Sequence, residues 1–131
     1  MVHLLGIPAS NSENSINAML VRCAIEVMTA KFEFAVEHSI LDLNDFEMPI
    51  YKAQRETANG IPDQAKTFVR AIESSDAVII SFAEHNGNYS AAFKNVFDWA
   101  SRINQKVYRH KALLLMATSP GSRGGKAVLD I

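Results

Sequence analysis

The chain has 131 residues, of which 48% are hydrophobic and 21% charged, enough for the core of one small domain covering residues 1–131. Thirteen Lys and Arg against 14 Asp and Glu leave a formal net charge of −1, which excludes the strongly basic surface typical of a nucleic-acid-binding protein. The apolar runs are far shorter than the roughly 20 residues that span a bilayer. Because there is one cysteine and no basic leader, we predict a cytoplasmic protein without nucleic-acid or membrane partners.

The first third of the chain predicts a strand, a helix and a second strand. Val2–Ile7 is apolar enough for a buried strand, and a polar loop, Pro8–Asn14, follows it. Apolar residues then recur at helical spacing from about Ser15 to Lys31. Cys23 falls among them, so we expect it to lie in the core. Apolar and polar residues alternate over Phe34–Ile40, a pattern typical of a strand at the edge of a sheet.

The middle of the chain predicts a long loop, a helix and a buried strand. Asn44–Gly60 is polar and contains proline and glycine, so we predict a connecting loop. Pro62 suits the first turn of a helix, whose apolar face continues to Ile72. Ala77–Phe82 is continuously apolar, as strands are when helices cover both faces of a sheet.

The last third predicts a helix over Phe93–Ile103, a strand over Ala112–Ala117 and a helix that begins near Gly125. The resulting order, βαβαβαβα, favours an α/β domain with a parallel sheet and right-handed crossovers. Ile131 lies only about two turns into the last helix, and so apolar a strand is hazardous at a sheet edge. We therefore expect a further strand and helix to be missing, or to be supplied by a partner.

Three polar loops follow the predicted buried strands: Pro8–Ser15, Ala83–Ser90 and Thr118–Gly125. The carboxyl ends of parallel strands meet at one edge of the sheet, where open α/β sheets bind their ligands. Polar loops converging above an apolar sheet predict a ligand site at this edge.

The first of these loops offers serine hydroxyls, asparagine amides and the free N–H groups of a helix start, which can hold a phosphate without a lysine. It is equally explained if Ser15 simply caps the helix. No Gly-Lys-Ser/Thr follows, so it is not a Walker motif.

In the second loop, Asn86-Gly87 favours a tight turn, and the amides suit a planar heterocycle. His85 is more simply a polar surface residue, since the four histidines show no paired spacing for a metal. The glycines of the third loop allow a ligand close to the backbone, or only form the turn into the helix. No G-x-S-x-G elbow is present. A bound cofactor, rather than a side chain, is therefore expected to carry any reaction.

Taken together, these segments resemble the NAD(P)H-dependent FMN reductase family, which includes quinone, azo-dye and chromate reductases. The strongest match is Ala83–Ser90 followed by Lys94-Asn95 and Asp98-Trp99, where the family has Pro-Glu-Tyr-Asn-Gly, a Lys-Asn and an Asp-Trp at the same spacing. Met48–Tyr51 and the Ser119-Pro120-Gly121 loop are also similar to the family's.

The resemblance implies a flavodoxin-like three-layer α/β sandwich with a parallel sheet, lacking the last strand and helix of the family. It implies an enzyme in which a hydride passes from NADPH or NADH to bound FMN, and electrons then pass to a quinone-like or other small acceptor. Members are commonly homodimers or homotetramers. The flavin carries the chemistry, so no catalytic side chain and no metal ligand is expected. The phosphate of FMN would be held by Ser10, Ser15 and Asn17, and its ring by Glu84, His85, Asn86, Gly87, Ser119 and Gly121.

The sequence departs from the family pattern at several positions. Ser12 stands where the family has an arginine, which removes a charge-assisted contact to the phosphate worth about 1.5–3 kcal/mol. Ala9, Ala83 and His85 replace the family's glycine, proline and tyrosine. Two alternatives stay open: an FMN-binding electron carrier, and a degenerate member without tight flavin binding.

Overall fold

The fold alternates strands and helices along the whole chain, and the computed structural model describes residues 1–131. The helices that begin at Ile16 and Ala91 each follow a serine cap, Ser15 and Ser90, whose side-chain oxygen accepts from a free N–H of the first turn. The elements in chain order are β1 (Val2–Ala9), α1 (Ile16–Lys31), β2 (Val36–Ile40), the 3-10 helix η1 (Leu43–Phe46), α2 (Ala53–Asn59), α3 (Asp63–Glu73), β3 (Ala77–Phe82), α4 (Ala91–Ile103), β4 (Ala112–Ala117) and α5 (Lys126–Leu129).

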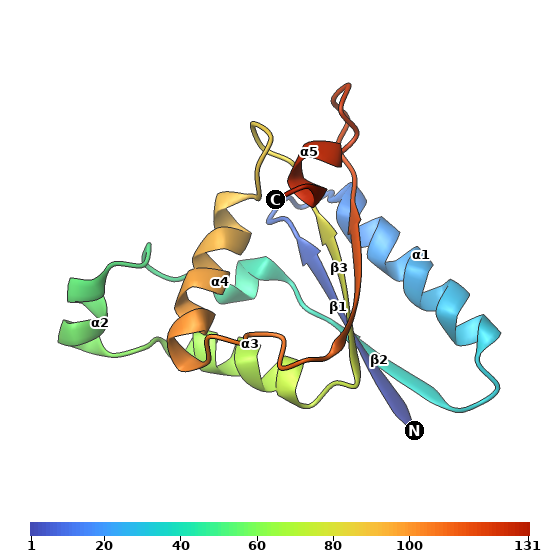
Figure 1. The fold of residues 1–131 in the computed structure, drawn as a ribbon, viewed down its shortest axis with the longest axis horizontal. Coiled ribbons are helices and arrows are strands. Elements are labelled where there is room, and N and C mark those ends of the chain that lie inside the picture. Colours follow the sequence, from blue (N-terminus) through green and yellow to red (C-terminus); the bar gives the residue numbers. More distant parts are fainter.

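The four strands form one parallel sheet in the order β2-β1-β3-β4. Helix α1 covers one face, while α3 and α4 lie on the other (Figure 1). The chain therefore passes from one side of β1 to the other between β2 and β3, which is the doubly wound, flavodoxin-like arrangement. The predicted α/β sandwich with a parallel sheet is confirmed, and β2 is an edge strand as its alternating pattern predicts.

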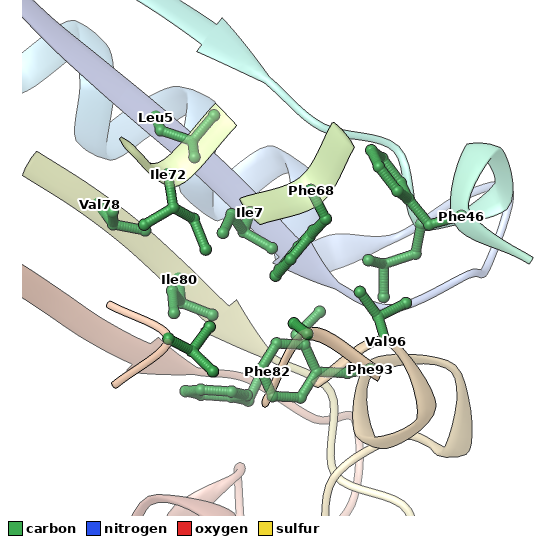
Figure 2. Packing of buried hydrophobic residues seen from close by; sticks show 14 of the residues in the cluster. Leu5, Ile7, Phe46, Phe68, Ile72, Val78, Ile80, Phe82, Phe93 and Val96 are labelled. Atoms are coloured by element: carbon green, nitrogen blue, oxygen red, sulfur yellow. The ribbon is translucent and has the colours of Figure 1, made fainter. Parts of the chain in front are cut away.

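The core is divided by the sheet into two clusters. The larger one fills the space between the sheet, α3 and α4, and Figure 2 shows Ile7 and Ile80 of the sheet meeting Phe68 and Phe93 of these helices. The smaller one joins β1 and β3 to α1 through Leu4, Ile79, Val21 and Ile25. Burial of this kind contributes roughly 25 cal/mol per Å² of apolar surface. Packing on both faces holds the strands of the sheet, and therefore the starting points of the loops, in fixed positions.

The apolar face predicted for α1 is partly wrong. Cys23 is exposed rather than buried, and Met19 is 65% exposed. The helix instead buries a stripe that begins at Asn17 and continues through Val21 and Ile25. A Cβ added to Gly6 of β1 would lie 2.6 Å from Cγ1 of Val21. The missing side chain at Gly6 thus lets the Val21 side of the helix approach the sheet, and the neighbouring apolar residues face outward.

The segment predicted as a loop, residues 44–60, contains most of η1 and all of α2. Phe46 packs in the larger cluster, with its ring 5.7 Å from that of Phe68. The indole Nε1 of Trp99 donates to the Pro49 carbonyl at 2.8 Å. These contacts, made with residues distant in sequence, order a segment that its composition alone marks as irregular.

Strand β4 lies at the free edge of the sheet and pairs only with β3. Its Leu113, Leu114 and Leu115 are each about two-fifths or more exposed. A helix able to cross a membrane would have to be longer and more apolar than any that the chain forms.

Candidate functional site

The three loops predicted to bind a ligand do converge. They meet at the carboxyl ends of β1, β3 and β4 around a cavity of about 360 Å³, within the size range of small-molecule sites. Six of the nine predicted residues line this cavity: Ser10, Ser15, Asn17, Glu84, His85 and Ser119. The other three do not line it and lie further along the same loops: Asn86, Gly87 and Gly121.

The first loop ends at the N-terminus of α1. Ser15 is the cap, and its Oγ accepts from the Ala18 N–H at 3.2 Å. The Ile16 and Asn17 N–H groups have no acceptor within the protein, so they remain available at the positive end of a 16-residue helix. Capping and anion binding are therefore compatible here, because they use different donors. The hydroxyl of Ser10 accepts from the Ser12 N–H at 3.1 Å and can still donate.

The side chain of Asn17 has a different role from the one that the resemblance implies. It is 3% exposed, and its Oδ1 accepts from the Ser81 hydroxyl at 2.7 Å and from the Thr118 N–H at 3.2 Å. Its Nδ2 donates to the Thr118 carbonyl at 3.2 Å. The amide thus joins the start of α1 to the ends of β3 and β4. Toward a phosphate, Asn17 offers its backbone N–H.

The second loop is a tight turn across His85–Asn88, as the Asn-Gly pair predicts. His85 and Asn88 exchange backbone hydrogen bonds of 2.9 and 3.1 Å, and the φ angles are 55° at Asn86 and 75° at Gly87. Two consecutive positive φ angles suit Asn followed by Gly. The N–H groups of Asn86 and Gly87 have no acceptor within the protein, which leaves two donors at the tip of the turn.

Two side chains join the second loop to its neighbours. Ser90 caps α4 by accepting from the Phe93 N–H at 3.2 Å, and its hydroxyl donates to the Ala9 carbonyl at 3.0 Å. Glu84 accepts from the Val128 N–H at 3.3 Å through Oε2. The cavity wall is therefore held from both sides before any ligand is present.

The third loop leads from β4 into α5 through Gly125, whose φ is 89°. A Cβ at that position would lie 2.9 Å from Cβ of Ala117. Gly125 is thus required by the turn into α5. Ser119 accepts from the Gly121 N–H at 3.2 Å, which folds the loop over the cavity edge.

The Lys-Asn and Asp-Trp motif residues lie outside the cavity, and two of them, Asn95 and Trp99, hold the segment after β2. Asn95 donates to the Met48 carbonyl at 3.1 Å and accepts from the Tyr51 N–H at 2.8 Å. Lys94 and Asp98 form an ion pair of 2.5 Å on the exposed side of α4. Partial desolvation and the hydrogen bond to Glu56 raise the pKa of Tyr51. This motif therefore has a structural role in the isolated chain.

The side chains of the cavity are not arranged as a metal centre. No group of three or more His, Cys, Asp and Glu side chains is placed to hold a metal ion. The cavity offers hydroxyls, amides and backbone donors instead. Sequence reasoning missed Ser81 and Ser90, although a serine inside an apolar strand and a serine before a helix are both recognisable signals.

The parallel sheet and its convergent loops define a flavodoxin-like α/β domain with a polar site at the carboxyl edge. The chain matches the model of the NADPH-dependent FMN reductase family over residues 2–130, and it belongs to that family. It is 30% identical over 125 residues to the quinone reductase of Escherichia coli K12, which covers 95% of this chain and 62% of that protein. The chain thus spans less than two thirds of that relative.

Solved structures agree with this assignment. The flavoenzyme NAD(P)H:(acceptor) oxidoreductase FerB from Paracoccus denitrificans superposes with a TM-score of 0.71 and 26% identity, covering 98% of this chain and 66% of that one. An oxidoreductase from Corynebacterium diphtheriae superposes with a TM-score of 0.78 at 20% identity, over 99% of this chain and 70% of its own. The latter likeness establishes the fold alone.

Proposed function

We propose that this chain binds FMN at the 360 Å³ cavity and acts as an NAD(P)H-dependent reductase of quinones or similar small acceptors. The observation that carries the proposal is the convergence of three loops whose free donors are backbone N–H groups rather than charged side chains. The relatives support it as well, since one is named a quinone reductase and another a flavoenzyme that oxidises NAD(P)H.

The residues present fit a flavin phosphate and ring. The free N–H groups of Ile16 and Asn17, with the hydroxyls of Ser10 and Ser15, form an anion cradle at a helix N-terminus. Asn86 and Gly87 lie outside the cavity lining, at the tip of the turn, and their free N–H groups would donate to the edge of the ring where it extends beyond the cavity. When bound, FMN would supply the hydride acceptor that the chain itself lacks.

The protein's own contribution is to orient the flavin and nicotinamide rings and to enclose them between the loops. The hydrogen bonds of Asn17 and Ser90 fix the spacing between the loops, and fixed spacing keeps two stacked rings in a productive geometry. No side chain of the cavity is assigned a proton transfer in the hydride step.

The test of flavin binding is the visible absorption spectrum of the purified chain, recorded before and after FMN is added and the sample desalted. Flavin bands that stay with the protein support the proposal. A colourless protein after this treatment contradicts the proposal and favours a degenerate site. The first change to make would then be Ser12→Arg, which restores the arginine of the family.

The test of the reaction is the oxidation of NADH and NADPH by the FMN-loaded chain with a quinone present. We expect a rate well above that of the same concentration of free FMN. A retained flavin without such a rate would identify an electron carrier instead of a reductase.

We also infer that copies of the chain associate as a homodimer or homotetramer. The exposed apolar residues Leu113, Leu114 and Leu115 on the edge strand support this inference, because an open apolar edge favours pairing. Light scattering should give a mass of two or four times the 14.5 kDa of one chain. A monomeric mass at micromolar concentration would contradict it.

A further inference from the structure

The two edges of the sheet differ in how they are protected from pairing with another strand. The middle of β2 holds a glutamate, a histidine and a serine, all exposed, and such side chains discourage edge-to-edge association. Strand β4, Ala112–Ala117, carries no polar side chain. The cation that precedes it, Lys111, is turned away from the edge, because its Nζ donates to the Glu73 carbonyl at 3.1 Å and to the Ser75 carbonyl at 2.6 Å. The β4 edge is therefore the unprotected one.

The exposed leucines of β4 lie on both faces of the sheet. Leu113 and Leu115 line a cavity of about 250 Å³ between β4, α4 and α5, and Leu114 points to the opposite face because side chains alternate along a strand. None of the three belongs to either core cluster. Lys94 is the one charged residue that lines the cavity, and it is paired with Asp98. Apolar surface thus surrounds the edge on both sides.

The backbone of β4 has unused hydrogen-bonding groups at the same edge. The Thr118 N–H donates to the Phe82 carbonyl at 3.2 Å, so the even-numbered residues of this segment direct their backbone groups toward β3. Successive residues of a strand direct them to opposite sides. The N–H and C=O groups of Leu113 and Leu115 therefore point away from the sheet, beside the exposed leucine side chains.

We propose that β4 pairs antiparallel with β4 of a second copy of this chain, with Leu114 of each copy at the two-fold axis. The pairing makes one continuous sheet with four strands from each copy. It rests on the association proposed above and names the surface that forms it. Because the contact is isologous and β2 is protected, the assembly closes at two copies.

The strand is complementary to itself in this register. Leu113 lies opposite Leu115 of the partner subunit and exchanges both backbone hydrogen bonds with it, and Leu114 meets its equivalent at a non-hydrogen-bonded position. Each exposed leucine thus faces a leucine, and the free backbone groups of Leu113 and Leu115 are all paired. Moving the axis to Leu115 would instead place Leu113 against Ala117, which Gly125 already crowds.

The apolar surface available to a second copy extends beyond the strand. A stable dimer buries about 800 Å² per partner, and Phe97 of α4 and Leu129 of α5 continue the surface from Leu113 and Leu115 around the cavity. A two-fold axis perpendicular to the sheet brings the two cavities side by side. With a formal net charge of −1 on each chain, long-range repulsion between copies is small.

The proposed pairing leaves each flavin site within one chain. Antiparallel strands direct the carboxyl ends of the two sheets in opposite directions, so the two FMN cavities lie at opposite ends of the dimer and share no residue. Loss of the dimer should therefore leave FMN binding unchanged, which separates the two proposals experimentally.

The first experiment tests the register by disulfide formation in a Cys23→Ala background, since Cys23 is exposed. Leu114→Cys should form a cross-linked dimer on mild oxidation, because facing residues at a non-hydrogen-bonded position have Cα atoms about 4.5 Å apart, within the range of disulfides. Leu113→Cys is the matched control, with the same exposure but a Cα separation on the order of 8 Å, too long for a disulfide. On a non-reducing gel, we expect at least 10-fold more dimer from Leu114→Cys.

The second experiment tests the surface by charge. Leu114→Lys sets two like charges opposite each other, so light scattering should give the mass of one chain while the affinity for FMN stays within about twofold of the wild type. His38→Lys introduces a lysine on the other edge strand, where His38 is exposed, and should leave the dimer intact.

The pairing is refuted if Leu113→Cys cross-links as much as Leu114→Cys, or if the dimer survives Leu114→Lys. It is also refuted if the wild-type chain is a monomer, and FMN binding by that monomer would leave the flavin site standing. A dimer that cross-links through Leu114→Cys but binds no FMN would support the pairing and contradict the flavin site.

Discussion

Replacing Asn17 by alanine should destabilise the protein much more than removing a polar side chain that merely faces the ligand cavity. The substitution removes three hydrogen bonds, to the Ser81 hydroxyl and to the N–H and carbonyl of Thr118. The Ser81 hydroxyl is fully buried, and a buried polar group left without a partner costs about 1–3 kcal/mol. The half-buried groups of Thr118 can partly regain solvent, adding about 1 kcal/mol.

The expected total is therefore a loss of about 2–4 kcal/mol in the free energy of unfolding. With urea m-values of about 1–3 kcal/mol/M, the unfolding midpoint should fall by roughly 0.7–4 M. The single tryptophan, Trp99, is buried, so its fluorescence reports the transition. Asn14→Ala is the matched control, because Asn14 lies on the same loop, is exposed and makes no side-chain hydrogen bond. We expect it to change stability by less than about 0.5 kcal/mol.

The reasoning would be refuted if the two variants unfolded at the same urea concentration. It would also be refuted if Asn17→Ala kept wild-type stability and lost only flavin affinity, because the side chain would then act on the ligand directly. The expected order is the reverse: a stability loss in the apo protein, with weaker flavin binding as its consequence.

Three further predictions concern the loops and the core. Ser12→Arg should tighten FMN binding about 10–100-fold in a flavin fluorescence titration, because it adds a charge-assisted phosphate contact. Thr29→Arg makes the same charge change at the far end of α1 and should leave the dissociation constant unchanged. Asn86→Ala should weaken FMN binding by more than Cys23→Ala does, since Asn86 holds a positive φ in the turn and Cys23 is an exposed side chain; equal effects would place the ring elsewhere. Burial raises the pKa of Tyr108, so the folded state holds that proton more tightly than the unfolded state, and the free energy of unfolding should fall as pH rises above about 10. Tyr108→Phe should reduce this slope in urea titrations between pH 8 and 11, and identical slopes would count against the assignment.

The elements of the fold were predictable because their signals are local. Ala77–Phe82 is apolar except at Ser81 and is buried on both sides, and the serine before Ile16 is the cap of its helix. The side of α1 that faces the sheet could not be chosen from periodicity, because Cys23 and Val21 belong to adjacent apolar stripes. The choice depends on Gly6 in another element, which removes a Cβ where Val21 must pack.

The residues around the cavity were predictable from the loops, but the division of roles among them was not. Asn17 was expected at the phosphate because it lies in the first helical turn, yet its amide is directed to Ser81 and Thr118. Those partners are 64 and 101 residues away in sequence. Only the topology brings them together, since parallel strands end at one edge whatever their separation along the chain.

The buried polar residues themselves mark the site. Five polar side chains are buried in this chain, and Ser75 is the one that lies away from the carboxyl edge of the sheet, where it donates to the Ile72 carbonyl. Ser10 lies at that edge and accepts from the Ser12 N–H within the first loop. The other three, Asn17, Ser81 and Ser90, join the ends of β1, β3 and β4 to the starts of α1 and α4. Burying a polar group is unfavourable unless its hydrogen bonds are made, and here every buried side-chain polar atom has a partner. An apolar edge would fold as well or better, but it would leave the loops free to move independently. The polar cross-links therefore serve the fixed spacing of the three loops, and this is the strongest structural reason to regard the carboxyl edge as a working site.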